Sequence, residues 1–164
     1  MLDKIVEHNA PPSESERNPE LLLADSKLDK LFSSIYDITH TRQILRLNGI
    51  DRVWSTKKGG HRLTVDYVHC LGNSQECFIE VHIAADVPGW LFTNLNQVTA
   101  IYNSHLSKVA VVDFMKLKRE VIALYKNKVY PLKNYRMEGS PRAGVFVPFG
   151  VIAEWGKVFE VRND

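Results

Sequence analysis

The chain contains 164 residues with a mass of 18.7 kDa, 45% hydrophobic and 24% charged residues, and a formal net charge of +2. These values fit one globular domain and exclude a disordered or fibrous chain. The longest nearly uncharged apolar run, Gly144 to Ala153, is ten residues long, whereas a membrane-spanning helix needs about 20. Met1–Asp25 lacks a basic and then apolar leader, so we expect a cytoplasmic protein.

The first 27 residues differ from the remainder in charge, with three basic and six acidic side chains. They include a Pro-Pro-Ser-Glu run that begins at Pro11. Such a polar, proline-interrupted stretch buries too little apolar surface to fold alone. We therefore predict a flexible acidic arm over residues 1–27, followed by a single α/β domain over residues 28–164.

The first predicted element of this domain is an amphipathic helix capped by Ser26. Its apolar residues recur at three- and four-residue spacing and are Leu28, Leu31, Phe32, Ile35 and Ile38. The pattern continues less regularly to Leu47 and stops at Asn48 and Gly49, so this part of the chain can also hold two short helices.

Two segments of alternating apolar and polar residues follow, Arg62–Leu71 and Glu76–Ala85, separated by a turn at Gly72–Gln75. Alternation over this length predicts two antiparallel strands joined as a hairpin. Cys70 and Cys77 flank the turn without the spacing of a zinc site, so we expect structural thiols that can face each other across it.

Residues after the hairpin return to helical spacing once Asp86–Gly89 has broken the pairing. The apolar positions of this predicted helix are Leu95, Val98, Ile101, Tyr102 and Leu106. Lys108–Phe114 then forms a short continuous apolar run, which is typical of a buried central strand.

The last third of the chain predicts one helix and two short strands. Asp113 is placed to cap a helix that ends near Asn127. Val145–Val147 and Lys157–Val161 resemble late strands, and Pro148 restricts the first of them to an edge or a bulge. This order of elements predicts an α/β fold with a mixed central β-sheet flanked by helices.

Glu80 and His82 are two residues apart, so in a strand both point to one face while Val81 points to the other. A turn with an odd number of residues places Asp66 opposite His82 and diagonal to Glu80, whereas an even number places it among the apolar side chains. Because an ionised carboxylate on an apolar face is costly, burial favours the arrangement that brings the acids together.

Two neighbouring carboxylates repel each other unless a cation lies between them, so Asp66 and Glu80 are candidate metal ligands. Mg²⁺, for which Mn²⁺ can substitute, prefers oxygen ligands and keeps waters that a phosphate can replace. Such a metal can activate water and stabilise the charge that develops on a phosphodiester during attack. Lys57, Lys58 and Arg62, beside two glycines, are candidate phosphate-binding residues.

At these residues the chain resembles the PD-(D/E)XK nuclease superfamily, whose pattern is an acid on one strand and an acid-x-lysine on the next. The matching residues are Asp66 and Glu80-Val81-His82, and the likeness of layout covers roughly Leu28 to Ala153. It includes the basic glycine-rich loop before Asp66, the Gly89-Trp90-Leu91 segment and the late Val145-Phe-Val-Pro run. His82 stands where members of the family usually carry lysine, and Val65 replaces the proline before the first acid.

This resemblance implies a restriction-endonuclease-like fold and a metal-dependent endonuclease that hydrolyses DNA phosphodiester bonds, as phage, restriction or homing enzymes do. It implies that Asp66 and Glu80 bind Mg²⁺ and that His82 takes the place of the lysine that positions or activates water. An extra acid from the first helix is common in the family, and Asp37 is the candidate. Cutting both strands of a duplex is simplest with two symmetry-related copies, so we expect a homodimer or a higher homo-oligomer.

Basic residues are concentrated between Met115 and Arg142, where eight lysines and arginines face only two glutamates. We predict that Lys116, Lys118 and Arg119 in this segment contact the DNA backbone, although they can equally form the solvated side of a helix. Asp66 and Glu80 can likewise be surface acids, and His82 a structural histidine.

The alternative function is a catalytically inactive protein of nuclease fold that binds nucleic acid or a protein partner, because His82 departs from the family pattern. A small-ligand protein or an assembly component with merely exposed acids is the third possibility, and it predicts neither metal binding nor DNA binding.

Overall fold

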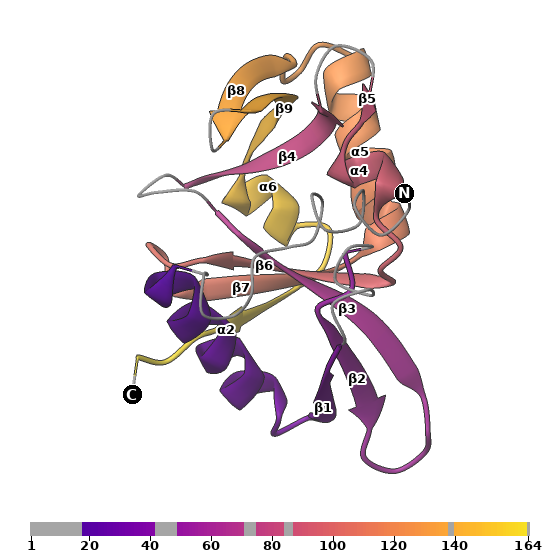
Figure 1. Ribbon diagram of the computed structural model, residues 1–164, viewed down its shortest axis with the longest axis vertical. Helices are drawn as coiled ribbons and strands as arrows, with labels where there is room; N and C mark the ends of the chain where they lie inside the picture. The colour runs from indigo at the N-terminus through magenta and orange to yellow at the C-terminus, as the bar shows by residue number, and fades with distance from the viewer. Residues whose placement is uncertain (1–17, 42–48, 71–74, 84–86, 138–139, 164) are drawn as a thin grey trace, which may run out of the picture.

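The computed structural model describes residues 18–41, 49–70, 75–83, 87–137 and 140–163, and these residues form a mixed α/β protein with two β-sheets (Figure 1). The six-stranded sheet contains, in spatial order, β1 (Tyr36–His40), β2 (Arg52–Thr56), β3 (Arg62–His69), β6 (Val98–Asn103), β7 (Lys108–Asp113) and β10 (Lys157–Glu160). The four-stranded sheet contains β5 (Val87–Pro88), β4 (Glu76–Ile83), β9 (Ser140–Pro148) and β8 (Lys133–Met137).

Strand directions distinguish the two sheets. In the six-stranded sheet β3 and β6 run parallel, and all its other neighbours are antiparallel. The four-stranded sheet is entirely antiparallel. The helices are α2 (Pro19–Phe32), α4 (Trp90–Thr93), α5 (Phe114–Lys126) and α6 (Phe149–Ala153).

Two hydrophobic clusters lie on opposite faces of the six-stranded sheet. On one face, α2 packs Leu28 and Phe32 against Trp54 and Val65. On the other face, residues of α5, α6, β4 and β9 pack against β6 and β7, so this cluster fills the space between the two sheets (Figure 1). The expectation of an α/β fold is confirmed, but the strands form two sheets where the sequence predicted one.

The first helix differs from its prediction at both ends. It begins at Pro19, where the Asn18 side chain accepts a hydrogen bond from the Glu20 N–H at 2.9 Å, so residues 19–27 are helical. Asn18 followed by proline at the first helical position is a stronger start signal than Ser26. The helix ends at Phe32, and Ile38 lies in β1 because its β-branched side chain suits the strand that pairs with β2. Residues 42–48 of the prediction lie outside the described residues.

The predicted hairpin between β3 and β4 is wrong in its pairing. Both strands exist close to their predicted bounds, but β3 pairs with β2 and β6, and β4 pairs with β5 and β9. Asp66 is therefore opposite Thr99 of β6 and not opposite His82. Alternation specifies that a segment is a strand, but it does not specify which strand pairs with it.

The helix predicted over residues 95–106 is also wrong, because residues 98–103 form β6. Residues Thr99 to Asn103 are all buried, as expected for a central strand covered on both faces. The β-branched Val98, Thr99 and Ile101 favour this conformation over a helix.

The later elements agree with the sequence. β7 occupies the predicted buried run, and α5 is capped by the Asp113 side chain, which accepts a hydrogen bond from the Lys116 N–H at 3.0 Å. Both late strands are present as β9 and β10. β9 is an inner strand of its sheet, however, and Pro148 is tolerated because it ends the strand and precedes α6.

Cys70 and Cys77 form a disulfide, which corrects the expectation of free thiols. Cys70 donates its N–H to Tyr102 of β6 and so stays with the six-stranded sheet, while Cys77 lies in β4. The bond therefore connects the two sheets. Disulfides persist mainly in oxidising surroundings, and the cytoplasmic location stays a prediction. Among the described residues, no helix has the length and apolar character needed to cross a membrane.

Candidate active site between the two sheets

Asp66 and Glu80 line one pocket of about 350 Å³, although their strands belong to different sheets. The pocket lies where β3 and β4 diverge, and its wall includes Leu21 of α2 and Trp90 of α4. Because β3 and β4 are not paired with each other, the space between them stays open as this pocket. In a hairpin, direct pairing of the two strands would have closed it. The acids are thus brought to a common pocket by the packing of the sheets rather than by strand pairing.

Trp90 contacts both acids. Its ring Nε1 donates to Asp66 Oδ2 at 2.7 Å, and its backbone N–H donates to Glu80 Oε1 at 3.0 Å. Gly89 precedes it, and a Cβ at this glycine would lie 2.9 Å from Glu80 Oε1. A side chain at position 89 would therefore displace the Glu80 carboxylate from the Trp90 backbone.

Asp66 is buried and is held by two donors on one oxygen, because Asn94 Nδ2 also donates to Oδ2, at 2.8 Å. The Asp51 carboxyl group lies beside it as a further hydrogen-bonding neighbour. Burial and the negative charge of Asp51 raise the pKa of Asp66 well above its usual value, while the bonds from Trp90 and Asn94 act in the opposite direction.

Asp51 and Asn94 are in turn held in place by the backbone. Asp51 Oδ2 accepts the Tyr67 N–H at 3.1 Å. Gly49 has a φ of 75°, and a Cβ there would lie 2.1 Å from Asn94 Nδ2. The glycine thus allows the chain before β2 to approach the amide that orients Asp66.

Glu80 lies at a β-bulge, because Glu80 pairs with Gly144 and His82 pairs with the adjacent Ala143. Its Oε2 is 3.5 Å from Arg142 Nη1. Both carboxylate oxygens therefore have protein partners, one from α4 and one from β9. The glutamate is a fixed, half-buried anion at the wall of the pocket.

His82 lies on the same strand and stacks on Phe92 of α4, with 6.5 Å between ring centroids. Its Nδ1 is buried and has no hydrogen-bond partner in the described part of the chain. Lys118 of α5 places its Nζ 5.3 Å from the centre of the same Phe92 ring. Lys118, which was predicted to contact DNA, thus lies beside the ring on which His82 stacks.

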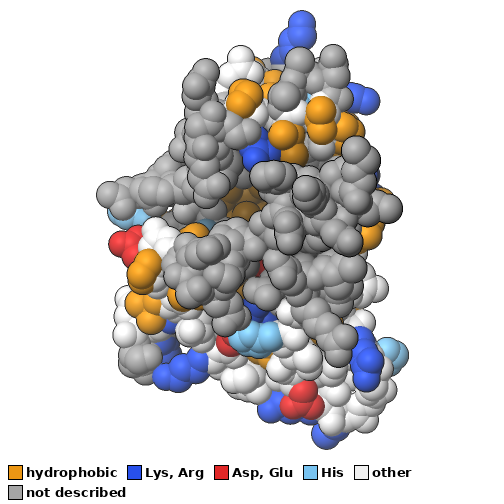
Figure 2. Space-filling view, in the orientation of Figure 1, with side chains coloured by type: hydrophobic (Ala, Val, Ile, Leu, Met, Phe, Trp, Pro, Cys, Tyr) orange, Lys and Arg blue, Asp and Glu red, His pale blue; other side chains and the backbone are white. Residues whose placement is uncertain are grey.

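The other predicted contacts lie farther away. Lys57 and Lys58 are exposed in the turn between β2 and β3, and Arg62 is four residues before Asp66, which is about 13 Å along a strand. Arg119 is exposed on α5 and lies 4.0 Å from Glu120. Asp37 is exposed on the edge strand β1 and not in a helix. On the face drawn in Figure 2, lysine and arginine side chains are dispersed rather than gathered in one patch.

The sequence did not single out Asp51, Asn94 or Arg142 as site residues, and it marked Trp90 only within the Gly89-Trp90-Leu91 segment. No local pattern marks the first three, since each reaches the site through tertiary packing. Within the described ranges, no group of three or more histidine, cysteine, aspartate or glutamate side chains has an arrangement that could hold a metal ion. Protein-family models, curated proteins and solved structures include no match to this chain.

Proposed function

We propose that the protein is a metal-dependent endonuclease that hydrolyses DNA phosphodiester bonds with a site of the PD-(D/E)XK kind. The observation that carries this proposal is the convergence of Asp66 and Glu80 on Trp90 at one pocket. Both acids come from separate strands and accept hydrogen bonds from Trp90 at the wall of this pocket. Two carboxylates in one pocket can provide the negative charge that a hard cation needs.

The pairing of Asp66 with Asp51 supports binding of a cation. The negative charge of Asp51 beside the buried Asp66 raises the pKa of Asp66, and a bound cation would offset the repulsion between the two carboxylates. Asp66 and Glu80, the proposed ligands, provide oxygen atoms only, which suits Mg²⁺ or Mn²⁺, and waters and a substrate phosphate would complete the coordination. When bound, the metal would supply charge stabilisation for the phosphate and a lowered pKa for water.

The remaining residues of the site orient these groups. Trp90 and Asn94 fix the oxygen of Asp66, and Arg142 fixes that of Glu80. In place of the lysine of the family pattern we propose His82, which lies two residues after Glu80 on β4 and whose buried Nδ1 has no hydrogen-bond partner among the described residues. We assign Lys118, whose Nζ lies 5.3 Å from the centre of the Phe92 ring, to neutralise a phosphate next to the one attacked.

The test is nicking of supercoiled plasmid by the purified protein in millimolar Mg²⁺, stopped by a chelator. Glu80→Gln keeps an oxygen for the Trp90 N–H but removes the charge, so we expect nicking to fall roughly a hundredfold. Glu154→Gln, an exposed acid after α6, is the matched control and should retain the full rate. Nicking that survives both the chelator and Glu80→Gln would contradict the proposal.

A non-catalytic protein that binds nucleic acid with the same fold is the second candidate. It is favoured by the engagement of both Glu80 oxygens with the protein, a geometry that a purely structural glutamate would also have.

His82→Lys separates the two candidates. If a weakened nuclease site is present, we expect lysine to raise the nicking rate by about tenfold, because the change restores the residue type that the family pattern has. DNA binding measured in parallel reports whether the fold is intact. Binding without nicking in both proteins would establish the second candidate.

A further inference from the structure

Three pockets follow one another along α2, and neighbouring pockets share lining residues. The pocket of Asp66 and Glu80 shares Leu21 and His69 with a second pocket of about 480 Å³. The second shares Lys27 with a third pocket, also of about 480 Å³, between α2 and the C-terminal strand. We call this series the α2 groove.

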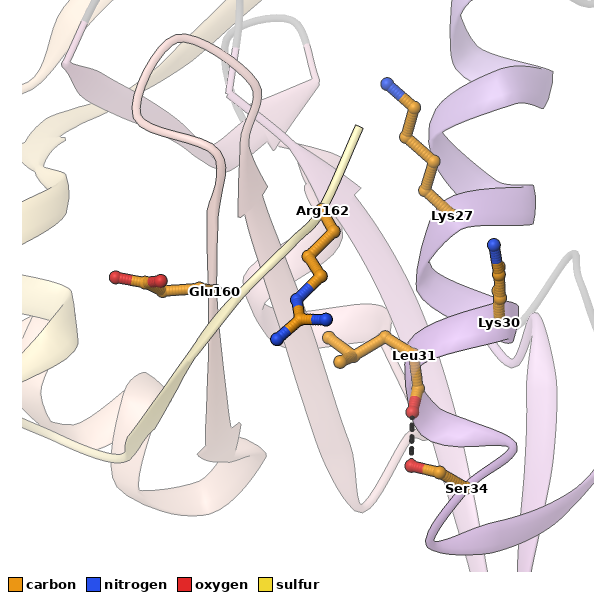
Figure 3. Close-up of a pocket in the computed structure, with 6 residues that line it drawn as sticks. All are labelled: Lys27, Lys30, Leu31, Ser34, Glu160 and Arg162. Carbon is orange, nitrogen blue, oxygen red and sulfur yellow. Dashed lines mark hydrogen bonds between the residues drawn. The ribbon is translucent and has the colours of Figure 1, made fainter. Parts of the chain in front are cut away.

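The third pocket carries an excess of positive charge. Its wall contains Lys27, Lys30 and Arg162, with Ser34 as a further polar group. Figure 3 shows Arg162 between the C-terminal strand and α2, with the two lysines extending from α2 beside it. Glu160 also lines the pocket, but its carboxylate points away from α2 (Figure 3). The side of the pocket that faces the helix is therefore cationic.

The length of the groove suits a nucleic-acid strand. Leu21 and Lys30 are nine residues apart in α2, which corresponds to about 13 Å at 1.5 Å per residue. Phosphates follow one another at about 3.4 Å of axial rise along each strand of B-DNA. A backbone whose scissile phosphate lies at Asp66 would thus bring a phosphate a few positions away to Lys27, Lys30 and Arg162.

We propose that Lys27, Lys30 and Arg162 bind the phosphate backbone of a DNA strand that follows the α2 groove to the pocket of Asp66 and Glu80. The direction of the strand rests on the proposed nuclease function, whereas the binding of the DNA backbone does not. Because the pocket offers charges and a hydroxyl group but no shaped contact to bases, the binding is independent of sequence.

The experiment measures binding of a fluorescent DNA duplex in a chelator, so that no cleavage occurs, over a series of salt concentrations. Each lost phosphate contact lowers the slope of log affinity against log salt by about 0.9. For the double variant Lys27→Ala and Arg162→Ala we expect a slope smaller by about 1.8 and an affinity at least about tenfold weaker at moderate salt. An unchanged slope and affinity would overturn the proposal.

The matched control is Lys108→Ala with Lys126→Ala, because both lysines are exposed and lie away from α2: Lys108 is opposite Glu160 in the register of β7 and β10, and Lys126 ends α5, which packs on the other face of the six-stranded sheet. This control should keep the affinity of the unaltered protein within about twofold. If the two double variants lose DNA affinity equally, the α2 groove is not the binding site and the proposal is wrong. Displacement of the duplex by inorganic phosphate at matched ionic strength would identify a small-anion pocket and would also overturn it.

Hydrolysis of bis(4-nitrophenyl) phosphate separates this inference from the proposed function. The small diester has no neighbouring phosphates, so its hydrolysis by the unaltered protein and the loss of that hydrolysis in Glu80→Gln report on the pocket of Asp66 and Glu80 alone. If neither protein hydrolyses it or nicks plasmid, the nuclease proposal fails, and the salt slopes still decide whether DNA binds along α2.

Discussion

Asp66→Asn is expected to stabilise the folded protein at neutral and alkaline pH while reducing Mg²⁺-dependent nicking by roughly a thousandfold. The introduced amide has the shape of a protonated aspartate. Its oxygen can accept the bonds from Trp90 and Asn94, and its nitrogen can donate to Asp51. The amide cannot, however, provide the negative charge that the proposed metal needs.

The sign of the pH dependence follows from the raised pKa of Asp66, which burial and Asp51 cause. A carboxyl group with a raised pKa in the folded state contributes stability that is fully present below its unfolded pKa, near 3.8. That contribution is lost as the pH rises through the folded pKa, by up to about 1.4 kcal/mol for each pH unit. Asp66→Asn has no ionisable group at this position, so it does not lose this contribution. The difference in free energy of unfolding between Asp66→Asn and the unaltered protein therefore grows with pH.

Urea unfolding in a chelator between about pH 4 and pH 8 measures this difference. Asp37→Asn, an exposed acid on β1, is the matched control and should follow the pH dependence of the unaltered protein. Millimolar Mg²⁺ should then raise the free energy of unfolding of the unaltered protein. It should leave that of Asp66→Asn unchanged, because an ion stabilises the folded state only where it binds. A stability difference that shrinks with rising pH would contradict the raised pKa of Asp66.

The elements that were predicted correctly are those whose signals are local. Asp113 caps α5 through a hydrogen bond to a residue three positions ahead, and the apolar Phe114, Leu117 and Val121 lie on one face of that helix. β7 is a run of buried residues that needs no partner to be recognised. Such features depend on neighbours within a few residues, which the sequence displays directly.

The errors concern tertiary choices. The residues between 95 and 106 satisfy helical spacing, yet β6 is placed between β3 and β7, where both faces are covered. Alternation identified β3 and β4 but could not specify β6 and β9 as their neighbours. A short separation along the chain favoured a hairpin, whereas burial of both faces of the six-stranded sheet decided the pairing.

The two acids that the sequence singled out line one pocket, but the strand pairing that was expected to bring them together is wrong. The cost of an unpaired charge indicated that Asp66 and Glu80 approach each other, and both do reach one pocket. The groups that hold them were not predictable, because Asn94 meets Asp66 across 28 residues and Trp90 meets it across 24. Long-range polar contacts of this kind leave no periodic pattern in a sequence.

Reduction of the Cys70–Cys77 bond is expected to lower the free energy of unfolding by about 2.5 kcal/mol, from the chain entropy of a closed loop of this length. For a chain of this size the loss corresponds to a fall of roughly 5–10 °C in Tm. The two sheets meet at this bond, next to the pocket that Asp66 and Glu80 share. The bond thus limits how far β3 and β4 can separate at the end of the pocket near Cys70.

Thermal unfolding with and without a phosphine reductant measures the effect. The matched control is the double variant Cys70→Ala and Cys77→Ala, whose Tm should match that of the reduced protein within a few degrees and should not respond to the reductant. Since Asp66 lies four residues before Cys70 and Glu80 three residues after Cys77, loosening this end also changes the separation of the two acids. Nicking by the reduced protein should therefore fall more steeply with temperature than nicking by the oxidised protein. Identical unfolding of the two forms would show that packing between the sheets, and not the disulfide, sets the width of the pocket.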